Sequence, residues 1–148
     1  MTVNGSGANA APSGAKRLSS ADAARMRKRM LVVDDEVRVL DVVREHFADR
    51  YEVDTAMSAT DAVHIFEQGR PDVVFLDLQM PGVDGLALLT FLRRVHPEVP
   101  IIIVSANTSH RVAHDCVKVG AFGYVPKPFN LVYMEHLAAA ALSSRYSR

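Results

Sequence analysis

Three short, unbroken runs of apolar residues stand out along the chain, at 30–33, 73–76 and 101–104. The runs are rich in β-branched side chains, and each is followed at once by a polar residue. Unbroken runs of this length are typical of parallel strands that are covered by helices on both faces. We therefore predict three central strands of one parallel sheet, with polar side chains at their carboxyl ends.

The remaining segments show weaker strand patterns and helical patterns in alternation. Residues 51–56 alternate as in a strand near the sheet edge, and residues 123–125 predict a short final strand. Apolar positions recur at helical spacing in five segments, at 37–47, 62–66, 85–95, 109–119 and 130–142. Gly69 and Gly120 occupy positions expected for helix C-caps, and Asn130 a position expected for an N-cap. Five strands alternating with five helices predict a doubly wound α/β sheet with right-handed crossovers.

The pattern predicts one domain at residues 29–144, an N-terminal arm at 1–28 and a short tail at 145–148. Small polar residues dominate the arm, which buries too little apolar surface to offset its ordering entropy. A basic run follows, at Arg25, Arg27, Lys28 and Arg29. We interpret this run as a solvated arm; the alternative is a docking arm for an acidic partner. We find no internal repeat and no second domain, and expect a stand-alone domain.

The composition narrows the class of protein. Lys and Arg together number 17, as do Asp and Glu, so no net field favours nucleic acid or an anionic membrane. The single Cys116 excludes an internal disulfide and falls in a helical pattern, where we expect it to be buried or half-buried. No apolar run is long enough to cross a bilayer, and the N-terminus lacks a signal-peptide core. We expect a cytoplasmic protein.

Five polar residues follow the predicted strands: Asp34, Asp35, Asp77, Ser105 and Lys127. Ligands of open α/β sheets bind at the carboxyl ends of the strands. Three carboxylates there repel one another unless a cation lies among them, and hard oxygen ligands suit Mg²⁺. A lysine and a hydroxyl can bind phosphoryl oxygens, and a carboxylate can attack phosphorus. Each residue alone has an ordinary alternative as a cap, a turn residue or a surface lysine, but their shared position favours one phosphoryl-transfer site.

Four motifs resemble the response-regulator receiver family. They are Leu31-Val32-Val33-Asp34-Asp35-Glu36, Asp77-Leu78-Gln79-Met80-Pro81-Gly82-Val83-Asp84-Gly85, Val104-Ser105-Ala106 and Tyr124-Val125-Pro126-Lys127-Pro128-Phe129. The resemblance covers residues 29 to 142, with the motifs in the family's order and spacing. It implies a flavodoxin-like fold, with a five-stranded parallel sheet in the order 2-1-3-4-5 and five helices.

The resemblance also implies a role for each site residue. Asp77 would be the phosphorylated residue, Lys127 would bind a phosphoryl oxygen, and Ser105 would move toward the phosphoryl group. The residues implied to hold Mg²⁺, with Mn²⁺ as a substitute, are Asp34, Asp35, Asp77 and, through its backbone carbonyl, Gln79.

Further positions carry implied roles around this centre. Tyr124 would rotate inward behind Ser105, and the Lys127–Pro128 peptide bond would be cis, an uncommon state even before proline. Gln79 and Asn107 lie two residues beyond the phosphorylated aspartate and the serine. In the family these two positions tune how fast water attacks the aspartyl phosphate.

The function implied is that of a switch, not of an enzyme, because the domain would catalyse only its own phosphorylation and dephosphorylation. The donor would be a histidine kinase or a histidine phosphotransfer protein docking near the first helix. Phosphorylation would reshape the face of the fourth helix, fifth strand and fifth helix, which would control a protein target in trans. Exposed candidates on that face are His110, His114, Lys118, Tyr133 and His136. We expect neither DNA nor membrane binding, and a monomer or a phosphorylation-dependent dimer.

Three rival functions are weaker. A haloacid-dehalogenase-type phosphatase carries an Asp-x-Asp pattern after its first strand, and Asp34-Asp35-Glu36 lacks that spacing. A flavodoxin-type binder needs neutral phosphate-binding donors after the first strand, where two carboxylates would repel a phosphate. A receiver-like module that acts without phosphorylation is the remaining alternative, and the retained acids, Ser105 and Lys127 argue against it.

Overall fold

A computed structural model describes residues 19, 27–107 and 109–146. Its sheet contains the strands β1 (Lys28–Val33), β2 (Tyr51–Ala56), β3 (Val73–Asp77), β4 (Ile101–Ser105) and β5 (Gly123–Pro126). All neighbours are parallel and the order is β2-β1-β3-β4-β5. The predicted doubly wound α/β fold with flavodoxin-like strand order is thus confirmed. β2 lies at an edge and is mostly half-buried, whereas β3 and β4 are buried throughout.

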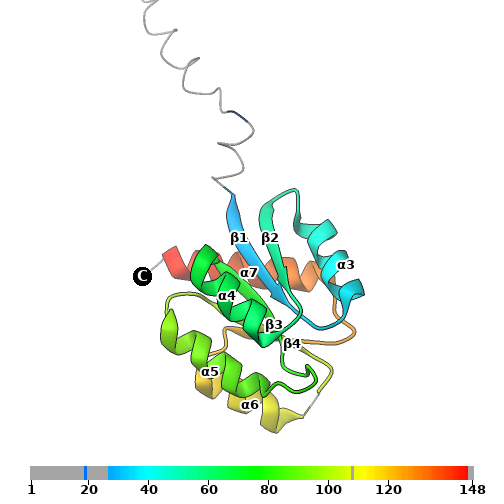
Figure 1. Ribbon diagram of the computed structural model, residues 1–148, viewed down its shortest axis with the longest axis vertical. Helices are drawn as coiled ribbons and strands as arrows, with labels where there is room; N and C mark the ends of the chain where they lie inside the picture. Colours follow the sequence, from blue (N-terminus) through cyan, green and yellow to red (C-terminus); the bar gives the residue numbers. More distant parts are fainter. Residues whose placement is uncertain (1–18, 20–26, 108, 147–148) are drawn as a thin grey trace, which may run out of the picture.

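The sheet is the middle of three layers (Figure 1). The helices are α3 (Val37–Phe47), α4 (Ala59–Gly69), α5 (Gly85–Val95), α6 (His110–Val119) and α7 (Leu131–Tyr146). Buried residues of α4, α5 and α6 form a core with one face of the sheet. Those of α3 and α7 form a second core with the other face. This is why both faces of the central strands had to be apolar.

Alternation within the strands is hidden by this double coverage. Leu31 and Val33 of β1 pack beneath α4, α5 and α6, whereas Met30 and Val32 pack beneath α3 and α7. Successive strand side chains point to opposite faces. Each four-residue apolar run therefore supplies both cores equally.

Two of the three predicted helix caps, Gly120 and Asn130, are confirmed. Gly120 is the C-cap of α6 and has a left-handed conformation, with φ at 114°. The Asn130 side-chain oxygen accepts a hydrogen bond from the backbone N–H of Tyr133 at 3.0 Å, as expected for an N-cap of α7.

The C-terminal ends of α4 and α7 differ from the prediction. The C-cap of α4 is Arg70, with φ at 39°, and Gly69 is the last helical residue. A Cβ at Gly69 would lie 3.0 Å from an Arg29 guanidinium nitrogen, so the glycine makes room for that side chain. α7 continues to Tyr146 instead of ending near Leu142, because residues 143–146 contain no glycine or proline that would end the helix.

Part of the basic run belongs to the sheet. Lys28 and Arg29 begin β1, and a guanidinium nitrogen of Arg29 donates to Asp54 at 2.8 Å. Arg27 donates to the carbonyl of Ala48, the C-cap of α3, at 2.9 Å. Arg27 and Arg29 therefore contact the domain, and Lys28, which the predicted arm included, belongs to β1. Most of the predicted arm lies outside the described residues.

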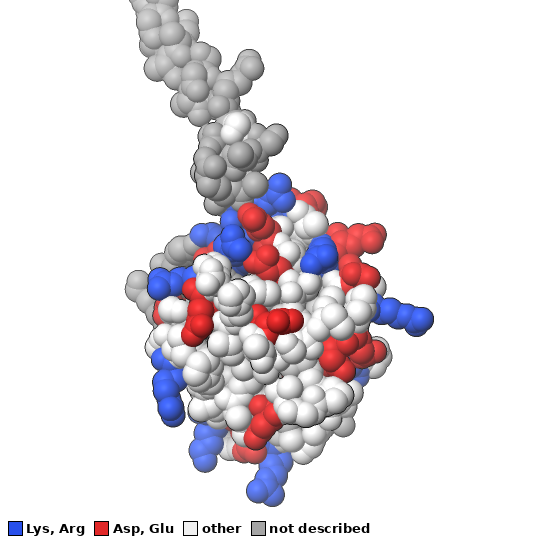
Figure 2. All heavy atoms as spheres, in the orientation of Figure 1, with Lys and Arg blue, Asp and Glu red and all other residues white. Residues whose placement is uncertain are grey.

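The distribution of surface charge and the burial of Cys116 match the expectations from the sequence. Lys and Arg side chains are interspersed with Asp and Glu on the face shown in Figure 2. Cys116 is buried, with 1% exposure, as expected. In residues 27–107 and 109–146, no helix combines the length and apolar character needed to span a membrane.

Candidate functional site

The carboxyl ends of four strands bring predicted site residues to one edge of the sheet. Asp77 and Ser105 are the last residues of β3 and β4, while Asp34 and Lys127 directly follow β1 and β5. The register pairs Ser105 with Pro126, which keeps the ends of β4 and β5 level. The edge therefore carries two carboxylates, a hydroxyl and an ammonium group from strands far apart in the sequence.

The ammonium group of Lys127 joins the two buried carboxylates. Its Nζ lies 2.8 Å from Asp34 Oδ2 and 3.2 Å from Asp77 Oδ2. The side chains of Asp34 and Asp77 are only 3% and 4% exposed. Charge-assisted hydrogen bonds of this kind are short and strong because both partners are ionised. Lys127 thus holds both acids in one place.

The second oxygen of each aspartate is held by the backbone. Asp34 Oδ1 accepts from Glu36 N, and Asp77 Oδ1 accepts from Gln79 N, both at 2.9 Å. Each is an Asx-turn, in which a carboxylate bonds to the backbone two residues on. The two carboxylates are therefore oriented before any ligand arrives.

Burial sets the electrostatics of the site. Burial raises the pKa of Asp77, and the nearby Asp34 carboxylate raises it further, while the Gln79 N–H and Lys127 act against both. Burial alone would lower the pKa of Lys127, but hydrogen bonds and attraction to Asp34 and Asp77 raise it overall. Removal from water penalises the charged form of either group, and an opposite charge restores it. A further positive charge near Asp34 and Asp77 would therefore stabilise their ionised forms.

Three carboxylates are close enough to share a metal ion. Oxygens of Asp34, Asp35 and Asp77 lie within 4.8 Å of one another. An octahedral Mg²⁺ with bonds of about 2.1 Å needs ligand oxygens roughly 3 to 4 Å apart, so small side-chain shifts suffice. Hard, acidic oxygen donors are the right chemistry for this ion. The predicted contribution of the Gln79 carbonyl stays a prediction.

Ser105 and Tyr124 are linked through one loop. Ser105 is fully buried, and its Oγ accepts from Asn107 N at 3.2 Å. The half-buried Tyr124 donates its hydroxyl proton to the carbonyl of Asn107. The backbone N–H of Lys127 donates to the Ser105 carbonyl at 2.9 Å. The ends of β4 and β5 and the loop after β4 are therefore joined by hydrogen bonds.

Two further observations concern the lysine. The Lys127–Pro128 peptide bond is cis. Glu36 Oε1 lies 3.8 Å from Lys127 Nζ, although sequence reasoning assigned Glu36 no role. Its position directly after Asp34 and Asp35 was the available signal. Glu36 itself is the N-cap residue of α3 and makes no side-chain cap, so the acids do not serve simply to cap that helix.

The predicted signalling face is exposed where expected. Five of its residues present exposed side chains on α6 and α7: His110, His114, Lys118, Tyr133 and His136. Val117 of α6 and Val132 of α7 add apolar surface, at 61% and 55% exposure. These two helices therefore offer both polar and apolar contacts to a partner.

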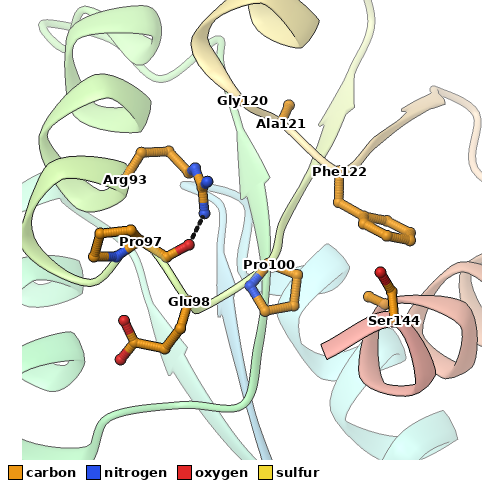
Figure 3. A pocket seen from close by; sticks show the side chains of 9 residues that line it. Arg93, Pro97, Glu98, Pro100, Gly120, Ala121, Phe122 and Ser144 are labelled. Carbon is orange, nitrogen blue, oxygen red and sulfur yellow. Dashed lines mark hydrogen bonds between the residues drawn. The ribbon is translucent and has the colours of Figure 1, made fainter. Parts of the chain in front are cut away.

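A cavity of about 250 Å³ lies away from this site, at the amino-terminal ends of β4 and β5. Figure 3 shows Arg93 on one side of it and Phe122 and Ser144 on the other. Pro100 and Phe122, which also line it, directly precede β4 and β5, whereas the acids and Lys127 lie at the carboxyl ends. An Arg93 nitrogen donates to the carbonyl of Pro97 at 2.5 Å, so two residues that line this cavity are bonded to each other.

Comparison with protein families gives one match that covers most of the chain. A model described as the response regulator receiver domain matches residues 30–139. The Escherichia coli regulatory protein AtoC is 35% identical over 115 residues, which are 77% of this chain and 25% of AtoC. NtrX of Azorhizobium caulinodans is 36% identical over 108 residues, 71% of this chain and 24% of NtrX. The chain spans about a quarter of the length of these two relatives.

Solved structures show the same architecture. The receiver domain of NtrX from Brucella abortus is 35% identical, with a TM-score of 0.72 over 77% of this chain and 98% of that chain. A CheY-like receiver domain protein from Methanospirillum hungatei gives a TM-score of 0.78 over 82% of this chain and 98% of that chain. At 24% identity this second likeness concerns the fold alone.

Proposed function

Since the chain belongs to the response regulator receiver domain family, we propose that it is a phosphoryl-accepting switch of two-component signalling with Asp77 as the acceptor. The observation that carries this proposal is the Lys127 ammonium group, which lies 2.8 Å from Asp34 and 3.2 Å from Asp77. A buried carboxylate beside a fixed cation and further acids suits attack on a phosphoryl group.

The acceptor step uses the Asp77 oxygen that faces Lys127. That oxygen attacks the phosphorus of a phosphohistidine, a P–O bond forms, the P–N bond breaks, and the bond's electron pair stays on the imidazole. The other oxygen still accepts a hydrogen bond from the backbone N–H of Gln79, which keeps the carboxylate oriented. Lys127 is already placed to bind a phosphoryl oxygen, so the site contributes mainly position and charge.

Asp34, Asp35 and Asp77 would hold Mg²⁺ in this proposal, and the Gln79 carbonyl would be an added ligand. When bound, the ion neutralises the acids and a phosphoryl oxygen. Ser105 Oγ accepts a hydrogen bond from the Asn107 N–H. Its own O–H is therefore still able to donate a hydrogen bond to a phosphoryl oxygen.

The signal passes through the loop after β4. A phosphoryl group that draws Ser105 toward itself also pulls on Asn107, whose carbonyl holds the Tyr124 hydroxyl. Tyr124 lies on β5, between α6 and α7, so its position sets the shape of that face. A target protein that prefers one shape shifts the equilibrium only by its differential affinity. Action on such a target in trans completes the proposal.

The donor is a histidine kinase or a histidine phosphotransfer protein, and the proposed compartment is the cytoplasm, where such donors are phosphorylated. Val37, at the start of α3 and 52% exposed, provides an apolar contact near Asp34 for the donor. The chain catalyses only its own phosphorylation and dephosphorylation, and it does not itself contact DNA. The relatives AtoC and NtrX are regulatory proteins about four times longer than the matched region.

Intact mass after incubation with Mg²⁺ and acetyl phosphate tests the proposal. We expect one phosphoryl adduct that needs Mg²⁺, is labile to hydroxylamine and is absent from Asp77→Asn. Asp41→Asn, at an exposed position of α3, is the matched control and should be phosphorylated like the wild type.

An adduct that persists in Asp77→Asn would assign the acceptor elsewhere. If neither acetyl phosphate nor a phosphorylated histidine phosphotransfer protein modifies the wild type, the chain acts instead as a phosphorylation-independent interaction module.

A further inference from the structure

A groove that adjoins the site of Asp34, Asp35, Asp77 and Lys127, here called the acidic site, runs between α5 and α6. It has a volume of about 270 Å³. Its lining residues, which define the α5–α6 groove, are Leu78, Gln79, Val83, Asp84, Gly85, Leu86, Asn107, Val112, Asp115 and Cys116. Pockets for drug-sized ligands usually hold about 300–1,000 Å³, so this one is better sized for a side chain or two of a partner.

The walls of the α5–α6 groove are apolar and incompletely covered. Leu78, Val83, Leu86 and Val112 pack against the core while remaining only partly buried, and Cys116 lies beneath them at 1% exposure. Partly exposed apolar side chains gathered in a concave site are the usual place for an apolar anchor of a binding partner. The groove can therefore bury one apolar side chain.

The polar part of the groove is acidic. Asp84 is exposed and uses one oxygen to accept from Ala87 N at 3.0 Å, which leaves the other oxygen available. Asp115 is half-exposed on α6. No basic residue lines the groove among the residues that the structure describes, and Arg111 and Lys118 of α6 lie outside its lining. Two carboxylates beside an apolar surface complement an apolar side chain that is followed by a cation.

The groove touches both loops of the acidic site. Gln79 lines it and donates its backbone N–H to Asp77, while Asn107 lines it and donates to Ser105. A segment seated in the groove would therefore contact the two loop residues whose backbone N–H groups bond to Asp77 and Ser105. Any movement that phosphorylation imposes on these loops therefore changes the groove.

We propose that the α5–α6 groove binds a short basic, amphipathic segment of a partner protein, and that phosphorylation of Asp77 changes its affinity for that segment. An apolar side chain of the segment lies against Leu86 and Val112, and a Lys or Arg pairs with Asp84 and Asp115. Affinity and phosphorylation are then linked reciprocally, because the two sites share the loops that carry Gln79 and Asn107. The linkage rests on the proposed function; binding to the groove does not.

Selection from a random peptide library displayed on phage, against the whole chain, tests the groove. We expect enriched peptides to combine apolar residues with Lys or Arg. Their affinity should fall at least ten-fold in the double variant Asp84→Asn, Asp115→Asn, and in Leu86→Ala. Asn is as good an N-cap as Asp, so α5 keeps its cap in the double variant. Asp61→Asn, an exposed position on α4, is the control and should bind like the wild type.

Two results would overturn the groove assignment. Peptides that bind all the variants equally would place the binding surface elsewhere. A dimer of the free chain that Leu86→Ala converts to monomer would make a second copy the occupant instead of a basic segment.

Affinity for a selected peptide is then compared with and without acetyl phosphate and Mg²⁺. We expect a change of about five-fold or more, and no change in Asp77→Asn. Unchanged affinity in a fully phosphorylated sample would refute the linkage. Failure to phosphorylate the chain would refute the proposed function instead, while groove binding would still be decided by the variants.

Discussion

The ammonium group of Lys127 bonds to both buried acids. Lys127→Met removes its charge while keeping much of its apolar stem. Asp34 and Asp77, at 3% and 4% side-chain exposure, then face each other without a cation. Loss of one partner of a buried ion pair costs about 3–5 kcal/mol. We expect the lower end, about 3 kcal/mol, because 16% exposure of the lysine lets water reach the site.

Urea and thermal unfolding in EDTA and in Mg²⁺ measure this loss. In EDTA the midpoint of thermal unfolding should fall by roughly 10 °C. In Mg²⁺ the difference in unfolding midpoint between the variant and the wild type should be smaller, because a bound divalent cation supplies the missing positive charge. A metal at 100 times its dissociation constant stabilises the folded state by about 2.7 kcal/mol. Lys118→Met, an exposed lysine on α6, should change stability by less than about 0.5 kcal/mol.

A double-mutant cycle separates charge from packing. If Lys127 acts by holding the acids, its loss should cost less in an Asp77→Asn background, where one carboxylate is already neutral. The reasoning would be wrong if Lys127→Met were as stable as the wild type in EDTA. It would also be wrong if the loss were the same in EDTA and in Mg²⁺, because the lysine would then contribute by packing alone.

Two other predictions concern a backbone contact and a surface cluster. A Cβ at Gly85 would lie 2.4 Å from a carbonyl oxygen of the loop after β3, so Gly85→Ala should displace that loop and weaken Mg²⁺ binding in calorimetric titration. Gly123→Ala, where the nearest contact is a side chain at 3.4 Å, should leave binding unchanged. Hydrogen bonds from His46 and Arg50 hold the pKa of the Glu135 carboxyl below its usual value. Its stabilising effect is therefore present above the unfolded pKa and lost as pH falls through the folded one, so Glu135→Gln should lower the urea midpoint at neutral pH but not in acid.

Much of the site could be predicted because parallel topology turns sequence order into spatial proximity. Once the runs ending at Asp34, Asp77 and Ser105 are identified as parallel strands, their ends must meet at one edge. Helix caps such as Gly120 and Asn130 were equally local signals. The burial of Cys116 also followed from its place in a helical pattern.

Other features depended on contacts that no local pattern encodes. Gly69 was interpreted as a C-cap, but its small size makes room for the guanidinium group of Arg29 on β1. Glu36 reaches within 3.8 Å of Lys127 only because the loops after β1 and β5 adjoin. The α5–α6 groove arises where residues of two loops and two helices converge.

The sequence by itself determined the strands, the helices and the polar residues at the carboxyl ends of the strands. Strands buried on both faces appear in the sequence as unbroken apolar runs, and each of these runs is followed by a polar residue. Only the tertiary structure decided how these polar residues pair. Lys127 and Asp34 are 93 positions apart, yet their charged atoms lie 2.8 Å from each other. Distances of this kind depend on how the helices pack the sheet, and packing is a property of the whole chain instead of any one segment.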